Sequence, residues 1–433
     1  MAKQEECMCG LNETDMFSPL DKQMDIESGQ IQQFSPQHDV KSDGHIEFTI
    51  AASPDAFTDL NESFLYLRLK VINKDGKNLT ESDEVSLTNN ILHSLFSDVS
   101  FYIGDTLVEG GTHNYSYKAY LQNLLLNGNN TKLGFLRSSG WYNDTPGKLD
   151  GVENEGYKNR KKLLKTSKVF DLCGPILLDI FTQNRFILPN VGMKLILQKN
   201  KPEFVSMLKA TNTLEGCKIV FEQALLNIRR VKASISKCLE IEDELAIKNA
   251  IIPIQQTRLI SFTIGKGSLS HERENLFSSI LPKAVFVCMV TNEAFNGGYT
   301  SNPFNFQHFN VNGIALFKDG TATPSQGYKP DFEKELTSLE YISLLQSLNM
   351  FNNNEENGIH ENFFRNGASI FGFNLCPNLM IGGLSHPIQP GSLKLSMTFS
   401  KQLENTINVV VMGIFDEHIQ IGKDRKVYCS WKA

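Results

Sequence analysis

The sequence predicts an all-β chain made of two tandem β-sandwich domains. Segments in which apolar and polar residues alternate, as in half-buried strands, dominate the chain. An internal repeat supports the duplication: NNILHSLFSDVSFYIGDTLV (residues 89–108) and FNFQHFNVNGIALFKDGTAT (residues 304–323) each join an aromatic-rich lead-in to an alternating stretch and a tight polar turn. A helical pattern follows each unit. The period of about two hundred residues indicates repeated domains rather than a solenoid.

The first half contains a run of strand signals and one helix. The segment VSFYIGDTLV predicts a hairpin with a Gly104-Asp105 turn. The helix is expected at residues 117–128, where apolar side chains share one face and a glycine ends the pattern. Further strands are predicted at HIEFTIAA (45–52), FLYLRLKVI (64–72), SKVFDLC (167–173), GMKLILQ (192–198) and CKIVFEQALLNIRRV (217–231), with residues 181–187 a weaker candidate.

The second half repeats this order after a charged helical connection, SKCLEIEDELAIKNA (236–250). A helix is expected at residues 334–349, after the second hairpin-like unit. Each half closes with Pro, Gly, a strand, a loop and a long final strand. Strands are predicted at TRLISFTI (257–264), KAVFVCMV (283–290), VNGIALF (311–317), SIFGFNL (369–375), SLKLSMTF (392–399) and INVVVMGIF (407–415).

These patterns divide the chain into five parts: an amino-terminal extension (1–40), a first domain (41–233), a linker helix (234–250), a second domain (251–415) and a carboxy-terminal tail (416–433). Domains of this size with long excursions fit the eight-stranded jelly roll, in which two four-stranded sheets pack face to face. The pattern alone does not separate a jelly roll from other sandwiches.

Composition excludes several classes of protein. The chain has 433 residues, 41% of them apolar, so it can fill a sizeable core. A net charge of -6 argues against a dedicated nucleic-acid binder. The start lacks the apolar run of a signal peptide, and the longest apolar runs, AVFVCMV and VVVMGIF, are too short to span a bilayer. We therefore expect synthesis in the cytoplasm or nucleus, where eight dispersed cysteines would not form a disulfide framework.

No catalytic, cofactor-binding or metal-binding residues emerge from the motifs. GKGS (265–268) lacks the order of a phosphate loop, and the Cys7–Cys9 pair has no second pair at metal-ligand spacing. The basic run KNRKKLLKTSK (158–168) could touch nucleic acid or a partner, but a solvated face is the simpler interpretation. A chain this long without a convergent constellation favours a structural role over an enzymatic one.

Two aromatic segments are candidates for contacts between subunits. FNGGYTSNPFNFQHFN (295–310) carries too many aromatic residues for a solvent loop, so it should either fold over its own sandwich or contact another subunit. The closing segment EHIQIGKDRKVYCSWKA (417–433) should either dock as an arm or pack on its own domain, whereas residues 1–16 should be mobile in an isolated subunit. The candidate interface residues are Tyr299, Phe304, Phe306, Phe309, Tyr428 and Trp431.

The chain resembles the major capsid proteins of Polinton (Maverick) elements and the related adintoviruses. The resemblance is carried in collinear order by DMFSPLDKQMDIESGQIQQFSP, by GHIEFTI with FLYLRLKVIN as a first strand pair, by NNILHSLFSDVSFYIGDTLV with YSYKAYLQNLL, by AFNGGYTSNPFNFQHFNVNGIALFKDG and by INVVVMGIFDEHIQIGKDRKV. It spans nearly the whole chain, which makes it more specific than any one motif.

The resemblance implies a double jelly-roll fold and a homotrimeric, pseudo-hexagonal capsomer of hexon type in an icosahedral virion capsid. It implies a minor penton-type capsid protein as a further partner, no enzyme activity, no cofactor and no sequence-specific nucleic-acid binding. Two alternatives stay open at this point. One is a host-domesticated binding protein derived from such an element. The other is a two-jelly-roll glycan hydrolase, which would need paired carboxylates in a cleft between the rolls.

Overall fold

The computed structural model describes residues 23–42, 44–209, 214–277, 280–352, 356–379, 387 and 389–432. Residues 1–22 lie outside this part of the chain. The expectation of a mobile segment at residues 1–16 and the Cys7–Cys9 pair therefore fall on residues that the structure does not describe.

The first half of the chain is an eight-stranded sandwich. One sheet has the strand order β1-β10-β3-β7 and the facing sheet has the order β2-β8-β5-β6, with all neighbours antiparallel. A short ladder of β4 and β9 lies beside it. The strands are β1 (Ile26–Phe34), β2 (Ile46–Ile50), β3 (Phe57–Asn73), β4 (Val85–Leu87), β5 (Phe96–Ile103), β6 (Thr106–Glu109), β7 (Phe170–Pro175), β8 (Met193–Lys199), β9 (Ser206–Leu208) and β10 (Cys217–Ala233).

The second half repeats the same topology. Its sheets have the orders β11-β18-β13-β16 and β12-β17-β14-β15, so in both halves the first, eighth, third and sixth long strands form one sheet and the second, seventh, fourth and fifth form the other. This topology confirms two tandem eight-stranded jelly rolls. The strands are β11 (Ala250–Ile264), β12 (Ser270–Arg273), β13 (Ala284–Thr291), β14 (Val311–Lys318), β15 (Thr321–Tyr328), β16 (Ile370–Asn374), β17 (Leu393–Phe399), β18 (Ile407–Ile421) and β19 (Val427–Cys429).

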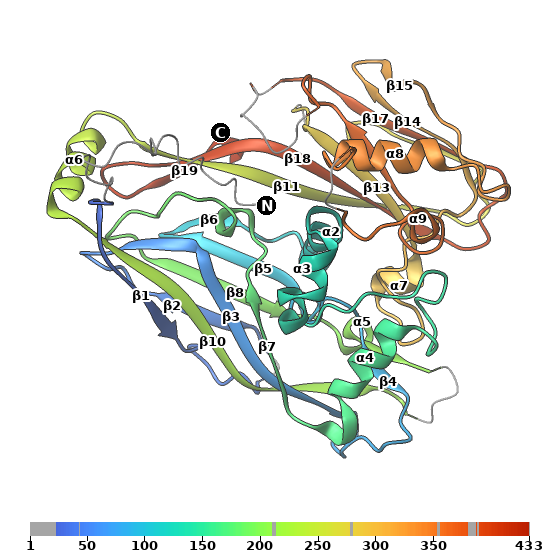
Figure 1. Cartoon of the computed structure of the whole chain (residues 1–433), viewed down its shortest axis with the longest axis horizontal. Coiled ribbons are helices and arrows are strands. Elements are labelled where there is room, and N and C mark those ends of the chain that lie inside the picture. Colours follow the sequence, from blue (N-terminus) through green and yellow to red (C-terminus); the bar gives the residue numbers. More distant parts are fainter. Residues whose placement is uncertain are drawn as a thin grey trace, which may run out of the picture.

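The helices lie in the connections between strands. Three of them confirm predictions: α2 and α8 follow the hairpins β5-β6 and β14-β15, and α6 joins the two rolls (Figure 1). The α-helices are α1 (Ile91–Ser94), α2 (Tyr115–Leu126), α3 (Asn129–Leu133), α4 (Glu155–Leu163), α5 (Pro202–Val205), α6 (Ile235–Leu245), α7 (Asn292–Asn296), α8 (Ser338–Ser347) and α9 (Glu361–Arg365). Short 3-10 helices occupy Phe135–Ser139, Lys165–Ser167, Asp179–Phe181 and Ser430–Lys432.

Two details of strand assignment differ from expectation. Residues 181–187, the weaker strand candidate, are not a strand: a 3-10 helix ends at Phe181, and only Ile187 forms an isolated bridge, with Thr58. The segments 45–52 and 64–72, expected as a strand pair, belong to β2 and β3 in opposite sheets. Consecutive strands that face one another across a core bury their apolar faces without sharing hydrogen bonds, which a sequence pattern alone does not distinguish from pairing.

The ends of the chain are part of the sheets. β1 lies inside the expected extension 1–40 and pairs with β10. β18 runs past the expected end of the second domain at residue 415 and continues to Ile421, where β19 folds back on it. Val427 and Cys429 are buried, whereas Tyr428 is 53% exposed. The closing segment thus packs on its own chain, which is the second of its two expected arrangements.

One hydrophobic core runs through both rolls. Figure 1 shows the rolls stacked one above the other, with α6 joining them at the left end and α2 and α7 lying near their junction on the right. β13 and the first half of β18 are apolar without alternation, because these inner strands are buried on both faces. Interior packing of this kind makes the two rolls a single rigid body rather than two domains on a tether.

Candidate functional site

The junction of the two rolls is built on a cluster of aromatic rings. Phe304 and Phe306, from the loop between β13 and β14, meet Tyr117 and Tyr120 of α2. The rings of Tyr120 and Phe304 are stacked with centroids 4.0 Å apart, and Tyr117 meets Phe304 edge-on at 5.7 Å. Phe204 adds a further edge contact to Phe304 at 5.9 Å. Each well-oriented ring pair adds about 0.5–1.5 kcal/mol to what the burial of its area contributes.

This placement confirms part of the aromatic prediction and corrects part of it. Phe304 and Phe306 are 0% exposed, as expected, while Phe309 is half-buried. Phe306 pairs through its backbone with Gly367 and Ala368 of its own roll, whereas the rings of Phe304 and Phe306 meet Tyr117 and Tyr120 of the first roll of the same chain, a contact that neither expectation included. A side chain with no exposed surface cannot reach another subunit, so Phe304 and Phe306 are not contacts between subunits.

The other candidate interface residues lie at or near the surface. Tyr299 is half-buried, and its hydroxyl donates to Glu203 Oε1 at 3.4 Å across the junction. Trp431 is partly buried against the core, and Tyr428 faces outward. Contacts of Tyr299, Phe309, Tyr428 and Trp431 with a second subunit remain predictions.

A buried charge cluster crosses the same junction. Lys118 of α2 donates to Asp179 Oδ2 at 2.8 Å and also to Glu109 Oε1. Asp179 Oδ2 accepts in addition from the backbone N–H of Thr257 on β11, at 2.7 Å, which ties the second roll to the cluster. Gln122 bridges the same two groups, donating to Asp179 Oδ1 and Thr257 Oγ1, each at 3.2 Å. Two carboxylates therefore share one ammonium group inside the protein.

Burial sets the protonation of this cluster. Burial, together with the charge of the neighbouring Asp179 carboxylate, raises the pKa of Glu109 to about 7, although Lys118 acts to lower it. Burial alone would lower the pKa of Lys118, but its two carboxylate partners outweigh burial and hold that pKa above its usual value. Lys118 is thus an ammonium ion paired with Asp179, and Glu109 is the group that gains or loses a proton near neutral pH.

We expect Glu109→Gln to change stability in a pH-dependent way. Because the folded-state pKa of Glu109 lies above the usual 4.5, the folded protein holds a proton that the unfolded chain releases between pH 4.5 and 7. The free energy of unfolding of the wild type therefore falls across this window, by at most about 1.4 kcal/mol per pH unit from this group. Glutamine mimics the protonated form. The free energy of unfolding of the variant, relative to that of the wild type, should therefore increase as the pH rises from 5 to 7. Urea unfolding of both proteins at several pH values measures the difference, and a constant difference would contradict the assignment.

Two further buried cations hold the surroundings of the junction. Lys132 donates from Nζ to the carbonyl of Leu124 at 2.6 Å and to the carbonyl of Asn357 in the second roll; burial lowers its pKa to about 7. Arg160 of α4 is fully buried and pairs with Asp144 at 2.8 Å. Because each charge is held by several oxygens, these groups fix the geometry of loops rather than offering a reactive site.

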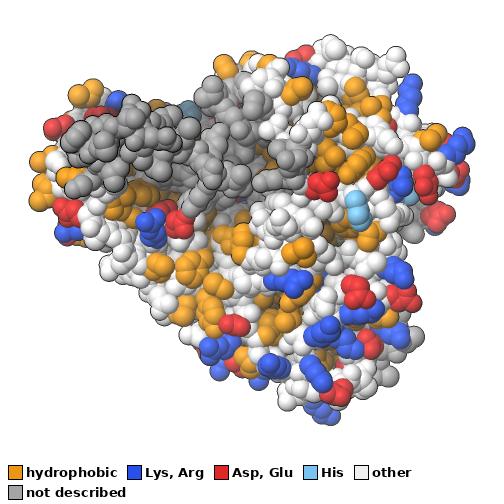
Figure 2. All heavy atoms as spheres, in the orientation of Figure 1, with side chains coloured by type: hydrophobic (Ala, Val, Ile, Leu, Met, Phe, Trp, Pro, Cys, Tyr) orange, Lys and Arg blue, Asp and Glu red, His pale blue; other side chains and the backbone are white. Residues whose placement is uncertain are grey.

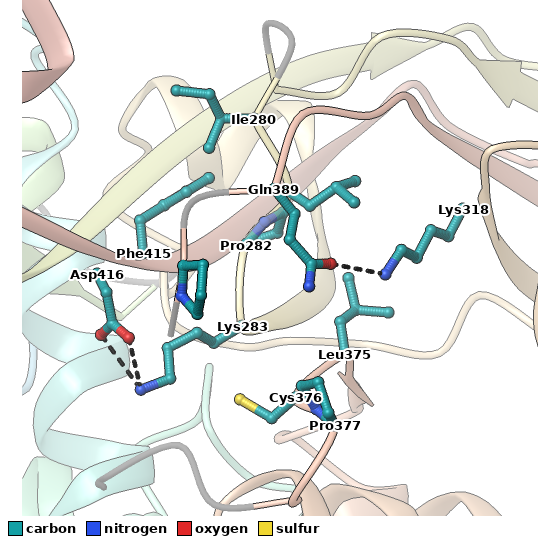
Figure 3. A pocket seen from close by; sticks show the side chains of 12 residues that line it. Ile280, Pro282, Lys283, Lys318, Leu375, Cys376, Pro377, Gln389, Phe415 and Asp416 are labelled. Atoms are coloured by element: carbon teal, nitrogen blue, oxygen red, sulfur yellow. Dashed lines mark hydrogen bonds and ion pairs between the residues drawn. The ribbon is translucent and has the colours of Figure 1, made fainter. Parts of the chain in front are cut away.

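Two pockets accompany the second roll. The first encloses about 40 Å³ at one end of that roll, where Lys283 pairs with Asp416 at 3.0 Å and Lys318 donates to Gln389 at 3.2 Å (Figure 3). The second encloses about 380 Å³ where the rolls meet, and Asp150 lines it while accepting from the backbone of Asn302 at 2.7 Å. In the first pocket Lys283 and Asp416 pair with each other and Lys318 is bound to an amide oxygen. The described residues contain no cluster of three or more His, Cys, Asp or Glu suited to a metal.

The basic run 158–168 is largely neutralised by nearby carboxylates. Lys161 pairs with Glu84 at 2.7 Å and Lys165 pairs with Glu81 at 2.8 Å. Figure 2 shows positive and negative side chains mixed over the end of the first roll that carries α4. Such a mixed surface supports the solvated-face interpretation rather than a phosphate-binding one. Within the described part of the chain, no helix combines the length and apolar character needed to cross a membrane.

Comparisons with known proteins agree with this architecture. No family model matches the sequence. An uncharacterized protein of Caenorhabditis elegans, F54H12.2, is 25% identical over 396 residues, which covers 87% of this chain and 91% of that protein. Among solved structures, the chain is similar to one from the Sputnik virophage, with a TM-score of 0.65, 12% identity and coverage of 96% of this chain and 91% of that chain.

Two capsid structures also share the fold. The mavirus major capsid protein gives a TM-score of 0.59 at 12% identity, over 96% of this chain and 93% of that chain. A chain of the PBCV-1 virus capsid gives the same TM-score and identity, over 96% of this chain and 99% of that chain. At these identities the likeness shows a common fold, and it extends over both rolls and their junction.

Proposed function

We propose that this chain is the major capsid protein of a virus or virus-like element: a structural subunit of hexon type that forms trimers, which in turn tile an icosahedral shell. The observation that carries the proposal is the fusion of two topologically identical jelly rolls, shared over nearly the whole chain with a chain of the Sputnik virophage, the mavirus major capsid protein and a chain of the PBCV-1 virus capsid. Three two-roll subunits present six similar units around a ring, which suits a pseudo-hexagonal capsomer.

The physical properties of the chain suit this role. A shell subunit must transmit load without flexing between its halves, and the shared core, the aromatic cluster and the buried charges make the junction rigid. With a net charge of -6, the chain would not neutralise the phosphates of a packaged genome, so other components would supply that positive charge. We further propose a penton-type minor capsid protein as a partner, assembly inside the host cell and location in the virion.

The closer affiliation that we propose is to the capsid proteins of Polinton-type elements and adintoviruses. The sequence resemblance supports it. The relative from Caenorhabditis elegans favours a second candidate, a domesticated protein that keeps the fold but builds no virion, because that relative is a protein of an animal. The glycan hydrolase keeps one supporting feature, since Asp150 and Glu293, one from each roll, both line the second pocket. It has less support than the other two candidates, because Asp150 already accepts from the Asn302 backbone and the Asn305 side chain, while Glu109 and Asp179 are bound to Lys118 and line neither described pocket.

We expect the purified protein to be trimeric at micromolar concentration. Light scattering or native mass spectrometry should give three times the 48.7 kDa mass of the chain, and electron microscopy at higher concentration should show hexagonal capsomers or shells. Obligate interfaces of this type bury on the order of 2,000–5,000 Å², so a capsid trimer should stay assembled at this concentration. A protein that stays monomeric under mild salt would contradict the capsid proposal and favour the domesticated alternative.

A further inference from the structure

The two rolls have the same topology but are not equally covered. β1 and β11 are the first strands of their rolls and hold the same edge position, beside β10 and β18. On β11, Ile252, Ile254, Gln256 and Thr257 are buried. On β1, every residue except Phe34 is exposed, including Ile31 at 55%. An open edge strand with an exposed isoleucine invites pairing or packing with another chain.

The helices after the hairpins show the opposite asymmetry. α2 follows β6 in the first roll, and all of its residues except Leu126 are buried. α8 follows β15 in the second roll, and only Glu340, Leu344 and Ser347 are buried. Leu339 in its first turn is 64% exposed, and Leu336 just before the helix is equally exposed. α8 thus packs on its own sheet through one face and leaves apolar side chains uncovered.

The covered elements are the ones that meet inside the chain. α2 and the loop at Asp179, from the first roll, lie against β11 of the second: Gln122 and Asp179 both bond Thr257, and Arg185 donates to the carbonyl of Ile251 at 2.5 Å. This contact joins the helix side of the first roll to the first-strand edge of the second roll, β11. The equivalent first-strand edge of the first roll, β1, and the equivalent helix side of the second roll, around α8, take no part in it.

We propose that these unused surfaces bind each other between copies of this chain, so that the α8 face around Leu336 and Leu339 of one subunit covers the β1 edge around Ile31 of the next. The inference rests on the proposed trimer and specifies its contact. β1 lies at the lower left of the molecule and α8 at the upper right (Figure 1), so one chain cannot bring the two together. A contact between unlike surfaces runs head to tail, and it closes into a ring when the rotation allows.

The chemistry of β1 favours a protein partner of this kind. The strand IESGQIQQF carries one charged residue, two isoleucines and three glutamines. Among the described strands β10 is its only sheet neighbour, so β1 presents the backbone groups of a sheet edge. Neutral amides and backbone groups can bond to a protein surface while the isoleucines and leucines exclude water. A strand without basic residues offers little to phosphates.

A complementation experiment tests the contact. Ile31→Glu disables the β1 surface and Leu339→Glu disables the α8 surface, because each buries a charge in the joined state. We expect each variant alone to be monomeric by light scattering. Mixed in equal amounts, they should form a dimer of twice the 48.7 kDa chain mass, since one intact surface of each kind remains. Leu269→Glu, at another exposed leucine (50%) just before β12, is the control and should stay trimeric.

The other outcomes have distinct meanings. A trimeric wild type whose trimer survives both substitutions overturns the contact and leaves the capsid proposal intact. A variant that forms dimers by itself overturns the head-to-tail arrangement, and a monomeric wild type overturns both proposals. If either glutamate variant fails to fold, Ile31→Cys and Leu339→Cys replace them: a short bismaleimide should cross-link the mixture but neither variant alone, with the wild type as background, and equal yields in all samples would overturn the contact.

Discussion

A chain carrying Phe304→Ala and Phe306→Ala is expected to lose more than about 5 kcal/mol of unfolding free energy and to fail to accumulate as folded protein. Removing one fully buried phenylalanine costs about 3–5 kcal/mol, through the lost burial and the cavity that remains. Both rings are 0% exposed and touch Tyr117 and Tyr120 in the other roll. The double substitution therefore leaves a cavity at the centre of the junction rather than at one edge of it. The total free energy of unfolding of a domain is only about 5–15 kcal/mol.

Matched variants separate this effect from the loss of any aromatic ring. Phe135 and Phe351 are 56% and 45% exposed, so their replacement by alanine should shift the melting temperature little. Circular dichroism melts and urea unfolding compare these with the single and double junction variants. Because the core is continuous through both rolls, the single variants should unfold in one transition at a lower temperature. A double variant that melts like the wild type would show that the junction is dispensable.

The strand content of both rolls could be predicted from the sequence because alternation and turns are local signals. The helix predicted at residues 117–128 is found at Tyr115–Leu126, and the expected Gly104-Asp105 turn joins β5 to β6. Pairing could not be read in the same way. β2 and β3 follow each other in the chain but lie in opposite sheets, because each pairs with strands that are distant in the sequence: β2 with β8, and β3 with β7 and β10.

The residue types at the junction could be predicted from the sequence, but the residues that they contact could not. The many aromatic residues of segment 295–310 predict that Phe304 and Phe306 are buried, yet nothing local indicates that their rings pack on α2, nearly two hundred residues earlier in the chain. The buried charges have one weak signal in the sequence: Lys118 is the only charged residue of α2. Its partners, Glu109 and Asp179, are separated from it by 9 and 61 positions and come together only when the two sheets close.

Lys118→Met is expected to destabilise the protein by about 3–5 kcal/mol, since removing one member of a buried ion pair leaves the others unpaired in a poorly solvating interior. Lys118 is 7% exposed and Asp179 is 2% exposed. Without the ammonium group, Asp179 keeps its bonds from Gln122 and the Thr257 backbone but loses its counter-charge beside Glu109. Urea unfolding at pH 7 measures the loss. Lys148→Met, which removes a solvent-exposed pair with Glu153, is the control and should change little.

Restoring neutrality separates the cost of unpaired charge from the loss of packing. In the triple variant Lys118→Met, Glu109→Gln and Asp179→Asn, no charge remains, and the asparagine oxygen can still accept from the Thr257 backbone. Replacing a whole buried ionic group by neutral side chains of similar size is often close to neutral in stability. We therefore expect the triple variant to be more stable than Lys118→Met alone, although it carries more substitutions. If it is instead less stable than the single variant, the cluster acts through its shape and hydrogen bonds, and the buried charge is not what holds the two rolls in register.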